Sequence, residues 1–308
     1  MSAVVVDRVT KSYGKERGAA LSGVSFEVTR GEIFGLIGPD GAGKTTLIRI
    51  LTTLLFADSG SARVLDRDVM TDFSEIRKIV GYMPGRFSLY QDLSVAENLA
   101  FFATVFGTTV EANYHLVADI YSQLEPFKDR LAGKLSGGMK QKLALSCALI
   151  HAPQILFLDE PTTGVDPVSR KEFWGMLGRL REAGITIVVS TPYMDEAARC
   201  DRIALIQEGK IMALDTLKVL LEGHSARVYS VRGTQLFRIL KDLRAYPETK
   251  YCFAFGQEHH LVLKNDARGP EQVLTYLKKM GHREATIRAV PPNIEDVFIA
   301  LNQEAPHD

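Results

Sequence analysis

The residues with the clearest chemistry form one glycine-rich loop: Gly38, Pro39, Asp40, Gly41, Ala42, Gly43, Lys44 and Thr45. Their spacing matches G-x-x-x-x-G-K-[ST], a pattern in which glycines let successive backbone N–H groups point at one anion. Lys44 adds a positive charge for the outer phosphates, and the Thr45 hydroxyl is a ligand for Mg²⁺. The alternative is a glycine-rich turn that matches by accident, which we expect in roughly one chain in a hundred of this length. The loop therefore predicts nucleotide binding.

A strand must lead into such a loop and a helix must follow it. Residues 31–37 form an apolar run that predicts a buried strand, and residues 46–51 have the apolar spacing of a helix. A helix that starts near Gly43 would turn its positive end toward the bound phosphates. The flanking pattern therefore supports the loop.

Two adjacent carboxylates, Asp159 and Glu160, end the apolar run 155–158. Hydrolysis of a phosphoanhydride requires Mg²⁺ near the phosphates and a group that orients water. Asp159 would hold the metal through water, and Glu160 would polarise the attacking water. Two solvated acids at a strand end are the alternative, which the phosphate loop and the apolar run upstream disfavour.

A second candidate phosphate contact is the triplet Ser136, Gly137 and Gly138, which precedes a predicted helix at 140–150. The N-terminus of a helix attracts anions. The alternative is an ordinary helix cap with a flexible glycine pair, and the triplet alone does not distinguish the two.

Strands alternating with helices over residues 1–221 predict a largely parallel α/β sheet. Helical patterning with few strand signals from about 89 to 150 predicts a helical subdomain, with Ser94 capping a helix and Glu97 three residues on. Residues 222–308 form a second domain in which βαββαβ patterning predicts a small α+β ferredoxin-like fold. We expect His259 and His260 at a solvated hairpin end and Trp174 in packing.

Composition narrows the function classes. Lysine plus arginine equals aspartate plus glutamate at 37 each, so the net charge is zero, which argues against a nucleic-acid partner that relies on a positive field. The three cysteines are far apart, which disfavours a zinc site or a disulfide framework. No basic leader opens the chain, and no run reaches the roughly 18 apolar residues that span a membrane.

Read together, these motifs resemble those of ATP-binding cassette (ABC) ATPases over about residues 1–220. LSGGMKQ at 135–141 resembles their signature, GPDGAGKTT at 38–46 their Walker A motif, and ILFLDE at 155–160 their Walker B motif. Val165-Asp166-Pro167 resembles their D-loop, and Tyr13 stands where an aromatic stacks on adenine. The ending PPNIEDVFIAL at 291–301 resembles the extension of cassettes that serve ABC-2-type exporters.

The resemblance implies the fold of a P-loop NTPase (an ABC cassette) and two cofactors, ATP and Mg²⁺. It implies Glu160 as the catalytic residue, Thr45 and Asp159 as metal residues, and as ATP-binding residues Tyr13, Gly38, Pro39, Asp40, Gly41, Ala42, Gly43, Lys44, Thr45, Thr46, Ser136, Gly137, Gly138 and Asp166.

The resemblance also implies partners. The triplet 136–138 of a second nucleotide-binding domain, in a homodimer or a paired cassette, would close the site. A separate membrane-spanning permease would contact the helical subdomain, which would place the protein in the cytoplasm, peripheral on the inner face of the plasma membrane. The transported substrate is not readable from the sequence.

The sequence departs from the family pattern at three positions. Asp40 replaces an asparagine, with a small expected effect. Gly85 stands where the family has a glutamine that binds Mg²⁺, and Gln91 would substitute only if the loop refolds. Pro192 stands where the family has a histidine, and proline has neither an imidazole nor an N–H group. We therefore hypothesise slow hydrolysis with ordinary MgATP binding.

Two rival interpretations remain at this point. One is a cassette protein of DNA repair, chromosome organisation or translation, which usually carries zinc cysteines, a coiled coil or a second cassette. The other is a regulatory or degenerate cassette whose output is ATP occupancy and which pairs with a catalytically intact one. Gly85 and Pro192 favour the second rival, and it is compatible with a transport role.

Overall fold

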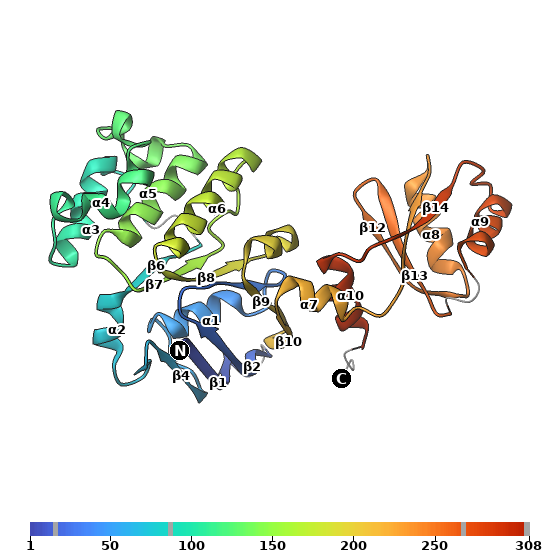
Figure 1. Ribbon diagram of the computed structural model, residues 1–308, viewed down its shortest axis with the longest axis horizontal. Helices are drawn as coiled ribbons and strands as arrows, with labels where there is room; N and C mark the ends of the chain where they lie inside the picture. The colour runs from blue at the N-terminus through green and yellow to red at the C-terminus, as the bar shows by residue number, and fades with distance from the viewer. Residues whose placement is uncertain (15–17, 86–88, 266–268, 305–308) are drawn as a thin grey trace. The chain divides into compact units, whose positions relative to one another are not determined.

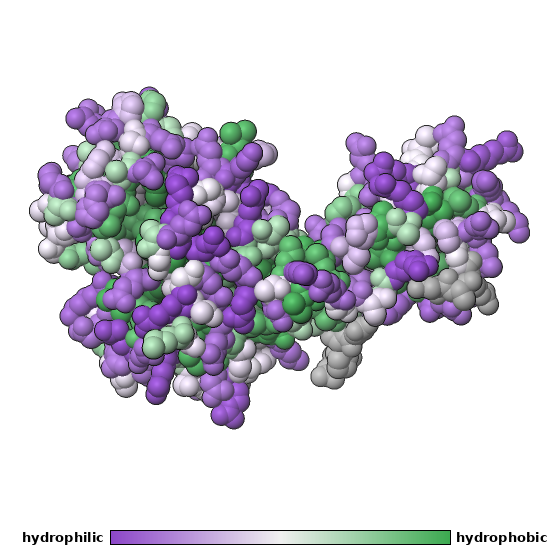
Figure 2. All heavy atoms as spheres, viewed as in Figure 1, coloured by the Kyte–Doolittle hydropathy of each residue, from purple (hydrophilic) through white to green (hydrophobic). Residues whose placement is uncertain are grey.

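The computed structural model describes residues 1–14, 18–85, 89–265 and 269–304, and it divides into two compact units, Met1–Leu217 and Lys218–Asp308 (Figure 1). Within the described ranges, no helix combines the length and apolar character needed to cross a membrane. Hydrophilic residues cover most of the first unit in the face that Figure 2 shows.

A six-stranded sheet forms the centre of the first unit, in the order β10-β9-β3-β8-β7-β6. Its strands are β3 (Ile33–Ile37), β6 (Val80–Met83), β7 (Ile155–Asp159), β8 (Thr186–Thr191), β9 (Arg202–Gln207) and β10 (Lys210–Asp215). All neighbours pair in parallel except β9 and β10, which form a hairpin. β3, β7 and β8 are buried along their whole length, because helices or a second sheet cover both faces. The predicted parallel α/β sheet is confirmed.

An antiparallel sheet and one helix cover one face of the central sheet. The sheet has the order β2-β1-β4-β5 and contains β1 (Ser2–Ser12), β2 (Ala19–Thr29), β4 (Ser59–Val64) and β5 (Arg67–Asp68). Helix α1 (Lys44–Leu51) packs in the same core, where Phe26 of β2 stacks on Phe34 of β3 with ring centroids 5.2 Å apart. Helix α2 (Phe73–Ile79) leads into β6.

Helices cover the other face of the central sheet. They are α3 (Val95–Val105), α4 (Val110–Tyr121), α5 (Gly137–Leu149) and α6 (Pro167–Glu182), with short 3-10 turns at Glu125–Phe127, Ala132–Lys134 and Met194–Arg199. Ser94 caps α3 in a capping box with Glu97, as predicted. Trp174 is buried in this core and packs with α5 and the sheet, which agrees with a packing role.

The second unit is an antiparallel sheet with helices. After α7 (Leu217–Glu222), its elements are β11 (Val228–Arg232), α8 (Leu236–Ala245), β12 (Thr249–Phe255), β13 (Glu258–Leu263), α9 (Gly269–Lys279), β14 (Thr286–Val290) and α10 (Ile294–Glu304). The strand order is β12-β13-β11-β14. Residues of α8 and α9 pack on one face, and Ile299 and Ala300 of α10 pack on the other.

The expectation that His259 and His260 are solvated is wrong. Their exposed fractions are 3% and 7%, because α10 and α8 lie over the hairpin end. His260 Nδ1 lies 2.8 Å from a carboxylate oxygen of Asp296 on α10, and His259 Nε2 lies 2.8 Å from the Leu236 carbonyl on α8. The Asp296 carboxylate raises the pKa of His260, whereas burial lowers the pKa of His259.

We predict that His260 titrates above its ordinary value of 6.5. A raised pKa means that protonation of His260 stabilises the folded unit fully below pH 6.5, and that this stabilisation is lost as pH rises through the folded pKa. An NMR titration of the His260 ring protons measures the midpoint, and Asp296→Asn should lower it. Asp242→Asn, which removes the carboxylate bonded to His282, should leave it in place. A midpoint that stays unchanged in Asp296→Asn would contradict the conclusion that Asp296 raises the pKa of His260.

Candidate nucleotide-binding site

The phosphate loop joins β3 to α1, so the predicted strand–loop–helix order is confirmed. The backbone requires glycine at two positions. Gly43 has φ +105°, and a Cβ there would lie 2.4 Å from the Ala20 carbonyl oxygen, while a Cβ on Gly38 would lie 2.1 Å from the carbonyl oxygen of Ile206. A left-handed φ and such close approaches exclude other side chains.

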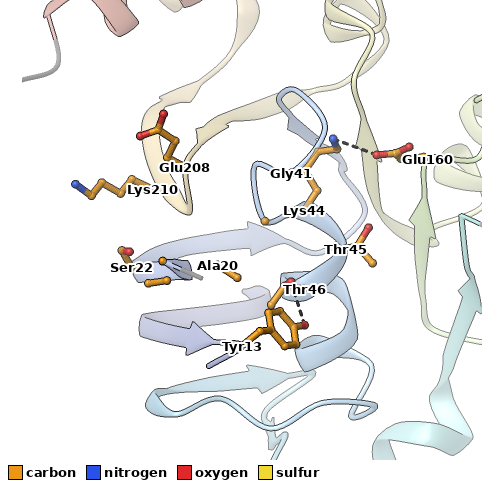
Figure 3. A pocket seen from close by; sticks show the side chains of 13 residues that line it. Tyr13, Ala20, Ser22, Gly41, Lys44, Thr45, Thr46, Glu160, Glu208 and Lys210 are labelled. Atoms are coloured by element: carbon orange, nitrogen blue, oxygen red, sulfur yellow. Dashed lines mark hydrogen bonds and ion pairs between the residues drawn. The ribbon is translucent and has the colours of Figure 1, made fainter. Parts of the chain in front are cut away.

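Lys44 is held inside the loop and is 3% exposed. Its Nζ donates to the carbonyls of Gly38 at 2.8 Å and Pro39 at 3.0 Å, and it lies 3.1 Å from Glu160 Oε1 (Figure 3). A phosphate that reached Lys44 would therefore compete with Glu160 for the ammonium group. Carboxylate and carbonyl oxygens of the site itself thus pair with the positive charge of Lys44.

The two predicted metal residues meet across the sheet edge. The Thr45 hydroxyl donates to Asp159 Oδ1 at 3.1 Å, although the two residues are 114 positions apart. A hydroxyl and a carboxylate at this distance form an oxygen set that suits Mg²⁺. Burial, together with the charge of Asp159, raises the pKa of Tyr82 on the neighbouring strand β6. The residues present therefore fit the metal.

A cavity of about 780 Å³ adjoins the loop. It is lined by Tyr13, Gly18, Ala19, Ala20, Ser22, Gly41, Gly43, Lys44, Thr45, Thr46, Glu160, Glu208 and Lys210. The Tyr13 hydroxyl lies 3.2 Å from the Thr46 hydroxyl, so the aromatic ring stands beside the start of α1 (Figure 3). The volume and the mixed lining suit a nucleotide.

Sequence reasoning missed Glu208 and Lys210. The turn between β9 and β10 brings them to the cavity, because the Gly209 N–H donates to the Ala42 carbonyl and the Gly209 carbonyl accepts from the Ser22 N–H. A Cβ on Gly209 would lie 2.7 Å from the Ala20 carbonyl oxygen. The pair Glu208-Gly209 predicts a turn from the sequence, but it does not predict which segments the turn contacts.

The triplet 136–138 opens α5, where the Ser136 hydroxyl accepts from the Met139 N–H. It is not among the described residues that line the cavity, so one chain does not bring it to Lys44. A Cβ on Gly138 would lie 2.6 Å from the Ser169 hydroxyl of α6, which explains that glycine by packing. Asp166 caps α6, and the Ser169 N–H lowers the pKa of its carboxyl.

The two unusual positions lie at the same edge of the sheet. A Cβ on Gly85 would lie 3.0 Å from the carbonyl oxygen of Asp159 and 3.7 Å from its carboxyl carbon. Pro192 follows Thr191, whose carbonyl accepts from the Gly38 N–H. Gln91 lies against Gly133 instead, where its carbonyl accepts the Gly133 N–H.

Comparisons with known proteins agree with this geometry. A family model described as "ABC transporter" matches residues 21–163. The chain is 39% identical over 288 residues to the Escherichia coli probable multidrug ABC transporter ATP-binding protein YbhF, which covers 92% of this chain and 49% of YbhF. The chain thus spans about half the length of that relative. It is 35% identical to the Nod factor export ATP-binding protein I of Rhizobium sp. (strain N33), over 98% of each chain.

Solved structures show the same fold for the first part of the chain. One is the ATP-binding cassette MJ0796, a dimer in a post-hydrolysis state bound to ADP and Pi, with a TM-score of 0.63 and 26% identity over 70% of this chain and 98% of that one. Another is cbiO1 from Clostridium perfringens, with a TM-score of 0.64, 25% identity and 72% and 91% coverage. The chain belongs to the ABC transporter family, as one of its ATP-binding cassettes.

Proposed function

We propose that the chain is the ATP-binding subunit of an ABC exporter and that it hydrolyses MgATP. The observation that carries this proposal is the convergence of Lys44, Thr45, Asp159 and Glu160 at one cavity. The names of its relatives, a multidrug transporter protein and a Nod factor export protein, support an export role. Purified protein should therefore release phosphate from ATP in a Mg²⁺-dependent way, and a chain that neither binds nor cleaves ATP would contradict the proposal.

The chemistry follows from where each side chain lies. Lys44 and the N–H groups of the loop would bind the β- and γ-phosphates, and the ring of Tyr13 would stack on adenine. Mg²⁺, held by Thr45 and Asp159, would neutralise charge on the phosphates. The γ-phosphate would release Glu160 from Lys44, and Glu160 would accept a proton from the attacking water. The oxygen of that water would bond to the γ-phosphorus, and the bond from the phosphorus to ADP would break.

A second cassette would complete the site. Ser136 and the start of α5 are exposed or half-buried apart from Gly138, and they would bind the γ-phosphate held by a partner copy. The dimeric state of MJ0796 supports this arrangement. The partner is a second copy of the chain or a different cassette.

We predict that Ser136→Arg abolishes ATP-dependent dimers but leaves ATP binding by the monomer intact. Turnover should fall by at least about 100-fold, because losing one donor to a transition-state oxygen costs about that much and loss of the dimer removes all the donors of residues 136–138. Light scattering with and without MgATP measures dimerisation. Ser122→Arg, an exposed serine that ends α4, is the matched control and should dimerise normally. Dimers that persist in Ser136→Arg would exclude this interface.

A groove beside β6, the edge strand of the central sheet, supports a membrane partner. It measures about 400 Å³ and is lined largely by apolar side chains from α3, β6 and α5. Leu54 and Val105 at this groove are 56% and 60% exposed. Exposed apolar residues that gather at one groove mark a binding site for another protein. We assign it to a separate permease, which would hold the protein at the inner face of the plasma membrane.

Two further parts of the proposal concern domains and rate. We take 1–221 as the nucleotide-binding domain, with its helical subdomain at about 89–150, and 222–308 as an accessory domain. We also propose that hydrolysis is slow, because Gly85 offers no side chain at Asp159 and Pro192 offers no imidazole. The same two residues favour the alternative of a regulatory cassette whose output is ATP occupancy beside an intact partner cassette.

A further inference from the structure

Ser190 lies at the centre of the proposed catalytic edge although no motif includes it. It is a residue of β8 and stands directly opposite Asp159 in the register with β7. Its exposed fraction is 0%, so water does not compete for its hydroxyl. The hydroxyl donates to Asp159 Oδ1 at 2.7 Å, the same oxygen that accepts from Thr45 at 3.1 Å.

The same hydroxyl also acts on Glu160. The Glu160 N–H donates to Ser190 Oγ at 3.0 Å and shares its proton with the Ser190 carbonyl at 3.1 Å. Glu160 has φ +51°, a left-handed backbone that a residue with a Cβ adopts only when its surroundings impose it. Ser190 thus supplies two acceptors at the point where the chain turns from β7 into the loop that carries Glu160.

A serine hydroxyl has one proton and two lone pairs, so it can donate and accept at once. Here the proton goes to Asp159 and a lone pair accepts from Glu160. One buried atom therefore fixes the rotamer of the metal carboxylate and the backbone of the catalytic carboxylate. A residue of similar size without a hydroxyl group does not supply both bonds.

We propose that Ser190 is a positioning residue for ATP hydrolysis, acting on Asp159 and Glu160 and touching neither nucleotide nor metal. This inference rests on the proposed function. It assigns the hydroxyl two measurable roles. One is to keep Asp159 oriented toward Mg²⁺, and the other is to hold Glu160 toward the attacking water.

Ser190→Ala tests both roles in the full-length protein. The value of kcat should fall about 10–100-fold, the usual effect of removing a partner of a metal-binding side chain. The affinity of the protein–ATP complex for Mn²⁺, followed by electron paramagnetic resonance as a probe for Mg²⁺, should fall about tenfold or more. The affinity for ATP without metal should stay at the wild-type value, because Lys44 and the loop are untouched.

Controls separate positioning from stability. Thr186→Val removes another buried hydroxyl of β8, one that accepts from the Gly31 N–H far from the site, and it should keep wild-type kcat and Mn²⁺ affinity. Ser190→Thr keeps the hydroxyl and should recover most of the activity. Ser190→Cys, nearly the same size with a weakly bonding sulfur, repeats the test should Ser190→Ala not fold.

The outcomes are distinct. Wild-type Mn²⁺ affinity and kcat in Ser190→Ala would overturn the inference, as would an equal loss in Thr186→Val. A wild-type protein without turnover would contradict the proposed function alone, since Mn²⁺ binding would still decide the role of Ser190.

Discussion

Glu160→Gln is expected to lower ATP turnover by about 100- to 10,000-fold, the contribution of a positioned general base. Glutamine keeps the size of the side chain but has no carboxylate to accept a proton from water. Glutamine is neutral and removes the ion pair that Glu160 makes with Lys44, so ATP binding should be retained or become tighter. The variant should therefore accumulate ATP-bound protein.

Phosphate release and equilibrium ATP binding, measured on the same preparation, check this prediction. Glu172→Gln is the matched control, because Glu172 is an exposed carboxylate on α6 that pairs with Lys142 away from the cavity. It should keep wild-type turnover. Equal turnover in Glu160→Gln and the wild type would show that another group, or a contaminating enzyme, cleaves ATP.

The combined variant Gly85→Gln and Pro192→His is expected to raise turnover. Under the proposed mechanism, each change would add a contact to the phosphates or metal of a kind worth about 100-fold in rate. The structure places residue 85 beside Asp159, so a glutamine side chain there starts next to the carboxylate that we propose as a metal ligand. The Cβ would lie 3.0 Å from the Asp159 carbonyl oxygen, so the loop must shift by a few tenths of an ångström, and the gain is expected to fall below the full 100-fold for this position.

Steady-state turnover with and without the proposed permease measures the repair. Gly178→Gln with Pro292→His introduces the same side chains elsewhere and should leave the rate unchanged; a Cβ on Gly178 meets no atom within 4 Å. A wild-type rate that already equals the repaired one would refute impairment. In that case Gly85 and Pro192 would be neutral replacements, and the regulatory alternative would lose its support.

Local patterns made much of the fold predictable. The loop at 38–45, its strand and its helix follow from glycine spacing and apolar periodicity, which are properties of short segments. The parallel sheet follows from alternating strands and helices, because parallel strands need a crossover between them. Ser94 and Glu97 are visible as a capping box for the same reason. The meeting of Thr45 and Asp159, 114 positions apart, was predicted from chemistry, because phosphoanhydride hydrolysis requires oxygen ligands for Mg²⁺ beside the phosphate loop.

Contacts between distant segments were not predictable. Ser190 reads as one more residue of a buried strand, and only its register with β7 places the hydroxyl on Asp159 and Glu160. His259 and His260 read as a polar hairpin end, because nothing near them in the sequence shows that Asp296 will pair with one of them. In each case the deciding partner belongs to another element.

A crystal structure of the Glu160→Gln variant grown with MgATP tests the central claim most directly. The account predicts a triphosphate bound by the loop 38–45 of one copy, with Mg²⁺ between Thr45 and Asp159, and with Ser136 and the following glycines of a second cassette on the γ-phosphate. A nucleotide bound elsewhere would contradict this account. So would a dimer with bound MgATP in which residues 136–138 of each copy face solvent.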